Sequence, residues 1–194
     1  MSKMDEKEEN LLEAAQRVFH RYGVKRASMA DIASEAGVSR QTLYNAFDNK
    51  DDIFRGTIRL YTDLAVAEIE ETIAGTSDVS KQIGAVLDVM SLKPYRNLKS
   101  SPNAEDLVAG FNAVGKKELE NGFQRYRGAL VKIFAPHADV LKTHSLTPES
   151  LAEIVQRGAS AMKYNAASEE HLVQMLDGVT ALAVHALTTP LPSK

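Results

Sequence analysis

Apolar residues recur at intervals of three and four along much of the chain. The first stripe comprises Leu11, Leu12, Ala15, Val18, Phe19 and Tyr22. This spacing places the side chains on one face of an α-helix, and Gly23 supplies the left-handed residue that often ends one. The pattern therefore predicts a first helix that closes at Tyr22.

Three further helices are predicted before residue 75. Ser28 can cap a second helix that ends at Gly37, and Ser39 can cap a third that carries Leu43 and Phe47. Asp48 can cap a fourth that runs to about Gly75. Its expected apolar side comprises Ile53, Phe54, Thr57, Ile58, Tyr61 and Leu64.

The remaining pattern is also helical. Helices are expected over 78–92, over 104–134 with a break at Gly115, from Thr147 to about Tyr164, and from Ser168 to before Pro190. The stretch "KPYRNLKSSPN" is interpreted as a connection because proline punctuates it. With no strand alternation, the prediction is an all-α fold. A three-helix head at 1–50 precedes a larger helical body at 51–194.

Composition narrows the class of protein. The 194 residues include no cysteine, which excludes disulfides and thiolate metal sites. The acidic start and the lack of a long apolar run favour a cytoplasmic protein without a membrane span. Net charge is −3, but residues 14–50 hold six basic side chains against three acidic ones. A phosphate-facing surface depends on such local sign more than on the total.

The stretch "GVSRQTLYNAF" at 37–47 has the pattern of a helix-turn-helix. Gly37 permits a sharp turn, and Leu43 with Phe47 anchors the second helix. Polar residues are left pointing outward: Ser39, Arg40, Gln41, Thr42 and Asn45. Amide side chains four apart suit an adenine edge, and arginine suits guanine or phosphate. These residues are predicted to read DNA.

The stretch "LLEAAQRVFHRYGVKRASMADIASEAGVSRQTLYNAFDNKDDIF" resembles the DNA-binding region of TetR-type transcriptional regulators. Its most specific matches are "DIASEAGVS" before the turn and "TLY..F..K" through the recognition helix. The resemblance covers about a quarter of the chain. It implies a DNA-binding regulator, most simply a ligand-responsive repressor of a palindromic operator; an activator or an effector-independent DNA-binding protein remains the alternative.

The resemblance also implies roles for single residues. Ser28 and Lys50 stand at the family's phosphate-contacting positions, as does Tyr44 through its hydroxyl. Ser39, Arg40 and Thr42 occupy its contact positions on the recognition helix. Two residues depart from the pattern. Gln41 replaces a frequent glycine, which suggests added base readout, and Ala46 replaces the usual histidine or aromatic residue, which puts one phosphate contact in doubt.

For the body, the resemblance implies a homodimer through the last two helices and a site for an unknown small-molecule effector. A monomer core would also explain the apolar last helix. The bulky body residues that are candidates for lining the effector pocket are Met90, Tyr95, Phe111, Phe123, Tyr126 and Met162. For each of them the sequence favours ordinary core packing over pocket lining, and the two tyrosines suit a mostly apolar pocket with a few polar groups best.

An enzyme is the remote alternative. No nucleophile motif, glycine-rich phosphate loop or paired carboxylates appear. His137 and His144 lie near Asp139, but sparse histidines of this kind are usually surface residues. We therefore expect no catalytic residues, no metal site and no cofactor.

Overall fold

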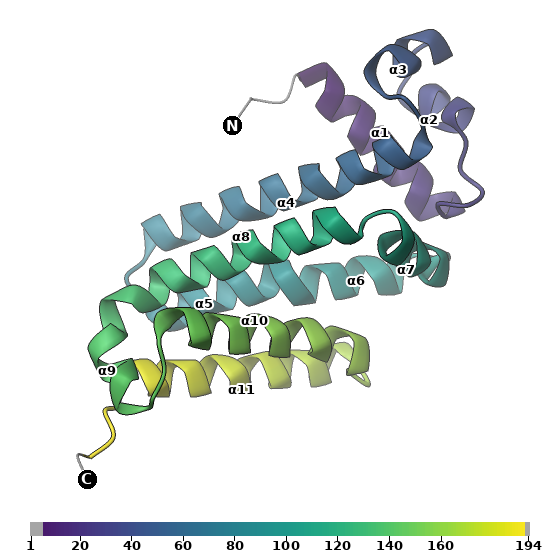
Figure 1. Cartoon of the computed structure of the whole chain (residues 1–194). Helices are drawn as coiled ribbons and strands as arrows, with labels where there is room; N and C mark the ends of the chain where they lie inside the picture. Colours follow the sequence, from purple (N-terminus) through teal and green to yellow (C-terminus); the bar gives the residue numbers. More distant parts are fainter. Residues whose placement is uncertain (1–5, 193–194) are drawn as a thin grey trace. The chain divides into compact units, whose positions relative to one another are not determined.

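The computed structural model describes residues 6–192, and every regular element in that range is helical (Figure 1). The predicted all-α class is confirmed. The helices pack into two compact units. The first reaches Asp63 and includes Leu98–Gly122, whereas the second comprises Leu64–Asn97 and the chain from Phe123 onwards. The predicted functional division at residue 50 is a separate matter, and it stays a proposal.

The first unit is built around the predicted head. Its helices are α1 (Glu6–Tyr22), α2 (Met29–Glu35), α3 (Arg40–Ala46), the first half of α4 (Lys50–Gly75), α7 (Ala104–Ala113) and the start of α8 (Lys116–Phe134). One apolar cluster unites them, with Leu12, Ile32 and Leu43 fully buried. The Phe19 ring meets the Phe54 ring edge-on, with centroids 5.3 Å apart. The hydrophobic core of the predicted head therefore includes residues that follow position 50.

The second unit holds the remaining helices. They are the second half of α4, α5 (Val79–Leu87), the π-helix Asp88–Leu92, α6 (Lys93–Ser100) as far as Asn97, the rest of α8, the 3₁₀ turn Ala135–His137, α9 (Ala138–Thr143), α10 (Pro148–Asn165) and α11 (Glu169–Thr188). The last two helices lie side by side (Figure 1). Thr147 and Ser168 cap them through backbone amides, as the sequence predicted. None of the helices in residues 6–192 has the length and apolar character that a membrane crossing demands.

Three expectations from the sequence are wrong. Helix α4 is capped by Asn49, whose Oδ1 accepts from the Asp52 amide at 2.9 Å, and not by Asp48. The stretch expected to be a connection after Leu92 contains helix α6. Pro94 is its second residue and lies directly after the π-helix Asp88–Leu92, so the helical run passes through this proline next to a π-helical turn. Leu64 is 53% exposed, not buried on the inner side of α4. The buried face passes instead through Ala65 and Ile69, which leaves Leu64 on the outside.

Candidate nucleic-acid interface

A tight turn joins α2 to α3. Gly37 adopts a φ of +65°, in the left-handed region that favours glycine. The Val38 amide then donates to the Ala33 carbonyl oxygen at 3.0 Å, which closes the turn. Leu43 and Phe47 are buried beneath α3. The turn and these anchors fix the direction of α3, as expected for a helix-turn-helix.

Ser28 caps α2 within a reciprocal arrangement. The Asp31 amide donates to Ser28 Oγ at 3.2 Å, and the Ser28 amide donates to Asp31 Oδ2 at 2.9 Å. The Ser28 hydroxyl also donates to this carboxylate at 2.6 Å. That hydroxyl bond, the main cause, lowers the pKa of Asp31. Ser28 thus builds the start of α2, and its phosphate contact remains a prediction.

Ser39 performs the same task for α3. Its Oγ accepts from the Thr42 amide at 3.1 Å and lies 2.9 Å from Thr42 Oγ1. The two hydroxyls therefore stabilise the N-terminal end of the helix. Both residues remain within reach of a ligand at this end, since Ser39 is exposed and Thr42 partly exposed.

The other predicted reading residues share the outer side of α3. Arg40, Gln41 and Asn45 are exposed, and the Tyr44 ring is 51% exposed. Gln41 Nε2 donates to Asn45 Oδ1 at 2.9 Å. The structure therefore gathers the predicted α3 residues on one short, polar helix. Their contact with DNA stays a prediction.

Lys50 is engaged differently from the other predicted contacts. Its ammonium group donates to the carbonyl oxygens of Val24 at 2.6 Å, Ala27 at 2.9 Å and Lys25 at 3.1 Å. An ammonium has three N–H donors, so these bonds employ its full capacity. A phosphate contact by Lys50 would have to replace one of them.

Two arginines of α1 form ion pairs with a glutamate at the end of α2. Arg17 Nε donates to Glu35 at 2.8 Å and Arg21 to the same carboxylate at 3.2 Å. The hydrogen bond from Arg17 is the main cause that lowers the pKa of Glu35, and the charge of Arg21 adds to it. Sequence reasoning missed this bridge, because nothing in the spacing shows which solvent-facing charges of two helices will meet.

Residues at the start of α7 form hydrogen bonds to the loop between α1 and α2. Asn103 Nδ2 donates to the Arg21 carbonyl at 2.9 Å, and Arg26 donates to Asn103 Oδ1 at 2.6 Å. Asp106 Oδ2 accepts from the Lys25 amide at 2.9 Å. Gly23, at φ +80°, is needed beside it because a Cβ there would collide with that carboxylate. These partners lie about 80 positions apart, so no local signal could have found them.

The six candidate pocket residues are not all brought together. Phe111 lies in the first unit, where its ring is 5.3 Å from that of Phe54 and packs on the head core. The other five belong to the second unit. Met90, Tyr95 and Tyr126 are buried there, and Phe123 with Met162 is partly buried. For Phe111 the structure thus favours the core-packing interpretation.

The second unit also contains an unusual lysine. Lys163 Nζ lies 5.4 Å from the centroid of the Phe123 ring and 5.0 Å from that of Tyr164. Burial lowers the pKa of its ammonium group to about 8.

In residues 6–192 no three His, Asp or Glu side chains are grouped so as to hold a metal ion.

Comparison with known proteins places the similarity where the helix-turn-helix lies. The family model of bacterial regulatory proteins of the tetR family matches residues 11–57. The HTH-type transcriptional activator FasR of Mycolicibacterium smegmatis is 31% identical over 84 residues, covering 43% of this chain and 38% of that protein. The nicotine-responsive repressor HdnoR of Paenarthrobacter nicotinovorans is 32% identical over 84 residues, 43% of each chain. The alignments thus span less than half of either relative.

The fold similarity extends over nearly the whole chain. The crystal structure of the transcriptional regulator FadR from Bacillus subtilis, in complex with stearoyl-CoA, matches with a TM-score of 0.59. The match covers 91% of this chain and 97% of that chain at 17% identity. At this identity the likeness concerns the fold alone.

Proposed function

Because the chain belongs to the TetR family of DNA-binding transcriptional regulators, we propose that it represses transcription by binding a palindromic operator as a homodimer. A small-molecule effector releases it. The observation that carries this proposal is the N-terminal end of α3. Arg40, Gln41 and Asn45 are exposed there on a helix held rigidly by the Ser39 cap and the Gly37 turn. This is the end of a recognition helix that enters a major groove.

The homodimer is supported by the outer side of α10 and α11. Ile154 is 58% exposed and Leu182 is 73% exposed, although both are large and apolar. Gly158 and Gly178 are open to their surroundings, with no atom near the place of a Cβ. Apolar side chains beside small residues permit two helices of a second copy to approach closely and bury this surface.

An effector site in the second unit is supported by its interior. Buried polar groups occur there among apolar ones: Ser91 donates to the Ala159 carbonyl at 3.0 Å, and Gln156 donates to Ser160 at 3.0 Å. Met90 and Tyr126 lie in the same unit, and Lys163 adds a partly buried cation. The relative HdnoR is nicotine-responsive and the structural neighbour FadR was solved with stearoyl-CoA, so regulators similar to this chain respond to or bind small molecules of different classes.

Activation is the second candidate, because the relative FasR is an activator. It needs the same α3 surface and the same homodimer. A reporter gene placed downstream of the bound operator distinguishes repression from activation. Deleting the regulator raises expression if it is a repressor and lowers expression if it is an activator. An operator affinity that no cell extract or metabolite library changes favours effector-independent binding.

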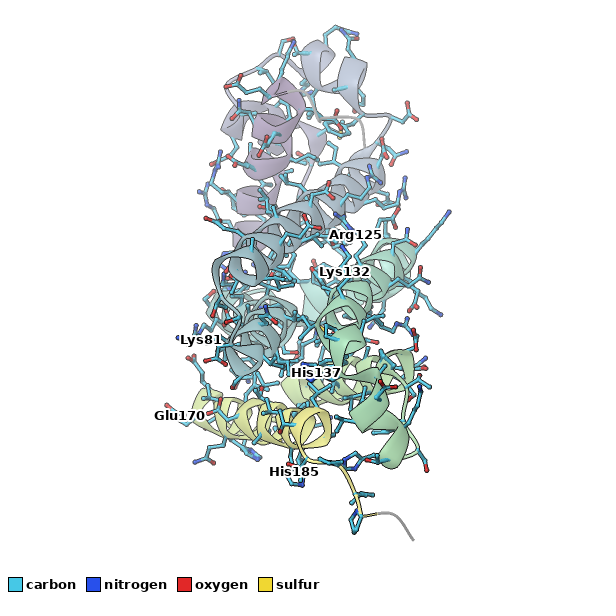
Figure 2. All side chains as sticks on the ribbon, turned by 90° about the vertical axis from the view of Figure 1, so that its left-hand side faces the viewer. Lys81, Arg125, Lys132, His137, Glu170 and His185 are labelled. Atoms are coloured by element: carbon cyan, nitrogen blue, oxygen red, sulfur yellow. The ribbon has the colours of Figure 1, made fainter. Side chains whose placement is uncertain are left out.

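The proposal is tested by binding to the DNA upstream of the chain's own gene. We expect a footprint with two-fold symmetry, and we expect Arg40→Ala to weaken binding by about 5- to 150-fold, since a lost arginine contact to a base costs about 1–3 kcal/mol. Lys81→Ala is the matched control, because Lys81 is an exposed cation of α5 in the second unit (Figure 2). Equal binding by Arg40→Ala and Lys81→Ala would contradict the assigned DNA surface.

A further inference from the structure

Two amide side chains of α3 are joined to each other. Gln41 Nε2 donates to Asn45 Oδ1 at 2.9 Å, across one turn of the helix. Both side chains are exposed, and within residues 6–192 neither makes another side-chain hydrogen bond. The bond restrains two side chains that would otherwise sample many rotamers in water. The pair is therefore arranged before any ligand arrives.

The two hydroxyls at the start of α3 are less available for base reading than this pair. The Ser39 and Thr42 hydroxyls are engaged with each other, and Ser39 Oγ also accepts from the Thr42 amide. Gln41 and Asn45 instead offer hydrogen-bonding atoms to the exterior. They are the two exposed amide side chains of the recognition helix.

The chemistry of the pair follows from counting its remaining groups. The mutual bond uses one N–H and one carbonyl lone pair. On the amide that donates, the carbonyl oxygen and one N–H remain; on the amide that accepts, the NH₂ group and one carbonyl lone pair remain. Exchanging O and N in both amides reverses the bond but leaves the same kinds of group. In either orientation the pair presents an acceptor beside a donor.

Only one base edge in the major groove matches that combination. Adenine presents the N7 acceptor and the N6 donor side by side. Guanine presents two acceptors, cytosine a donor, and thymine an acceptor with a methyl group. We propose that Gln41 and Asn45 act as one coupled unit that reads a single adenine in each operator half-site. This inference rests on the proposed function, since it requires α3 to lie in the major groove.

The test begins with the full-length chain and a pool of randomised duplexes. Selection should give a half-site with one position at which adenine is strongly preferred. Replacing that adenine by any other base should weaken wild-type binding by about 5- to 150-fold. In Gln41→Ala and in Asn45→Ala the preference at this position should disappear, while preferences elsewhere in the half-site persist.

Coupling is measured by combining the two substitutions. If the amides act as a unit, the double variant binds the selected duplex about as weakly as either single variant. Gln124→Ala, at an exposed glutamine of α8, is the matched control and should retain the wild-type preferences. Thermal unfolding of each variant confirms that the fold is unchanged.

The outcomes separate this inference from the function on which it rests. If the two variants relax different positions, or if the position lost by both prefers a base other than adenine, the coupled adenine reader is overturned. Unchanged preferences in both variants overturn it as well, while leaving the DNA-binding function intact. If the wild-type chain enriches no sequence at all, the proposed operator binding itself is overturned.

Discussion

Lys50 Nζ donates to the carbonyl oxygen of Val24 at 2.6 Å, joining the start of α4 to a loop 26 positions earlier. The same ammonium also holds the carbonyls of Lys25 and Ala27. A lysine that the family resemblance assigns to a phosphate is therefore, in this chain, also a clamp on the backbone between α1 and α2.

Lys50→Met tests the clamp. Methionine retains the apolar stem but removes all three hydrogen bonds, so the free energy of unfolding should fall by about 1–3 kcal/mol without DNA. Lys81→Met, at an exposed lysine, should leave it unchanged. A phosphate contact would appear separately, as a salt dependence of operator binding reduced by about one ion for each lysine. Unchanged stability with a reduced salt slope would assign Lys50 to DNA alone.

Gly56→Ala should destabilise the protein. Alanine favours a helix over glycine by about 1 kcal/mol, but its Cβ would lie 2.6 Å from Leu12 Cδ2. Leu12 is fully buried and packed in the apolar cluster, and overpacking of such a side chain costs about 1–3 kcal/mol. We expect a net loss of about 1 kcal/mol in urea unfolding.

The control for Gly56 is Gly128→Ala on α8, where a Cβ meets no atom within 4 Å. There only helix propensity acts, so stability should rise by up to about 1 kcal/mol. If both substitutions stabilise, the close approach of α4 to α1 is not as tight as described.

Lys163 should make stability depend on pH. Burial lowers the pKa of its ammonium from 10.5 to about 8, so the unfolded chain binds more protons than the folded chain between these values. Stability from this group therefore rises as the pH increases from about 8 to 10.5. At pH 7 the folded protein carries the cost of a partly buried charge.

Lys163→Met removes that cost. We expect a gain of about 1–3 kcal/mol in the free energy of unfolding at pH 7, which shrinks as the pH approaches 10.5. Urea titrations at pH 7 and pH 10, with Lys81→Met measured alongside, give the difference. A gain of equal size at both pH values would mean that packing, and not ionisation, sets the effect.

Leu182→Glu should separate the proposed homodimer. A two-fold interface contains each substitution twice. Two carboxylates would therefore be buried in an apolar surface when the dimer forms, which is unfavourable. Light scattering should show a monomer at micromolar concentrations, with weaker operator binding. Leu64→Glu is the matched control, since Leu64 is 53% exposed on α4. A dimer that withstands Leu182→Glu but not Leu64→Glu would place the interface elsewhere.

The sequence predicted local structure well because its signals are local. Ser39, Thr147 and Ser168 each stand before a helical pattern, and each caps the expected helix. Proline misled the interpretation at position 94, because a proline usually ends a helix, whereas here the helical run continues from the π-helix Asp88–Leu92 into α6.

Long-range partners were not accessible in this way. Glu35 meets Arg17 across two helices, and Asn103 meets the backbone of Arg21 across 82 positions. Such contacts depend on how helices pack, which a single sequence does not specify.

The shared core of the first unit limits how the DNA-reading part can be handled as a module. Ile53, Phe54 and Ile58 close the apolar cluster from beyond residue 50, and Leu107 completes it from α7. A fragment cut at residue 50 would expose this interior to water and should be an aggregating peptide, not a miniature regulator. A chimera designed to transplant the DNA specificity of this chain must therefore carry two separate segments, the one up to Asp63 and Leu98–Gly122.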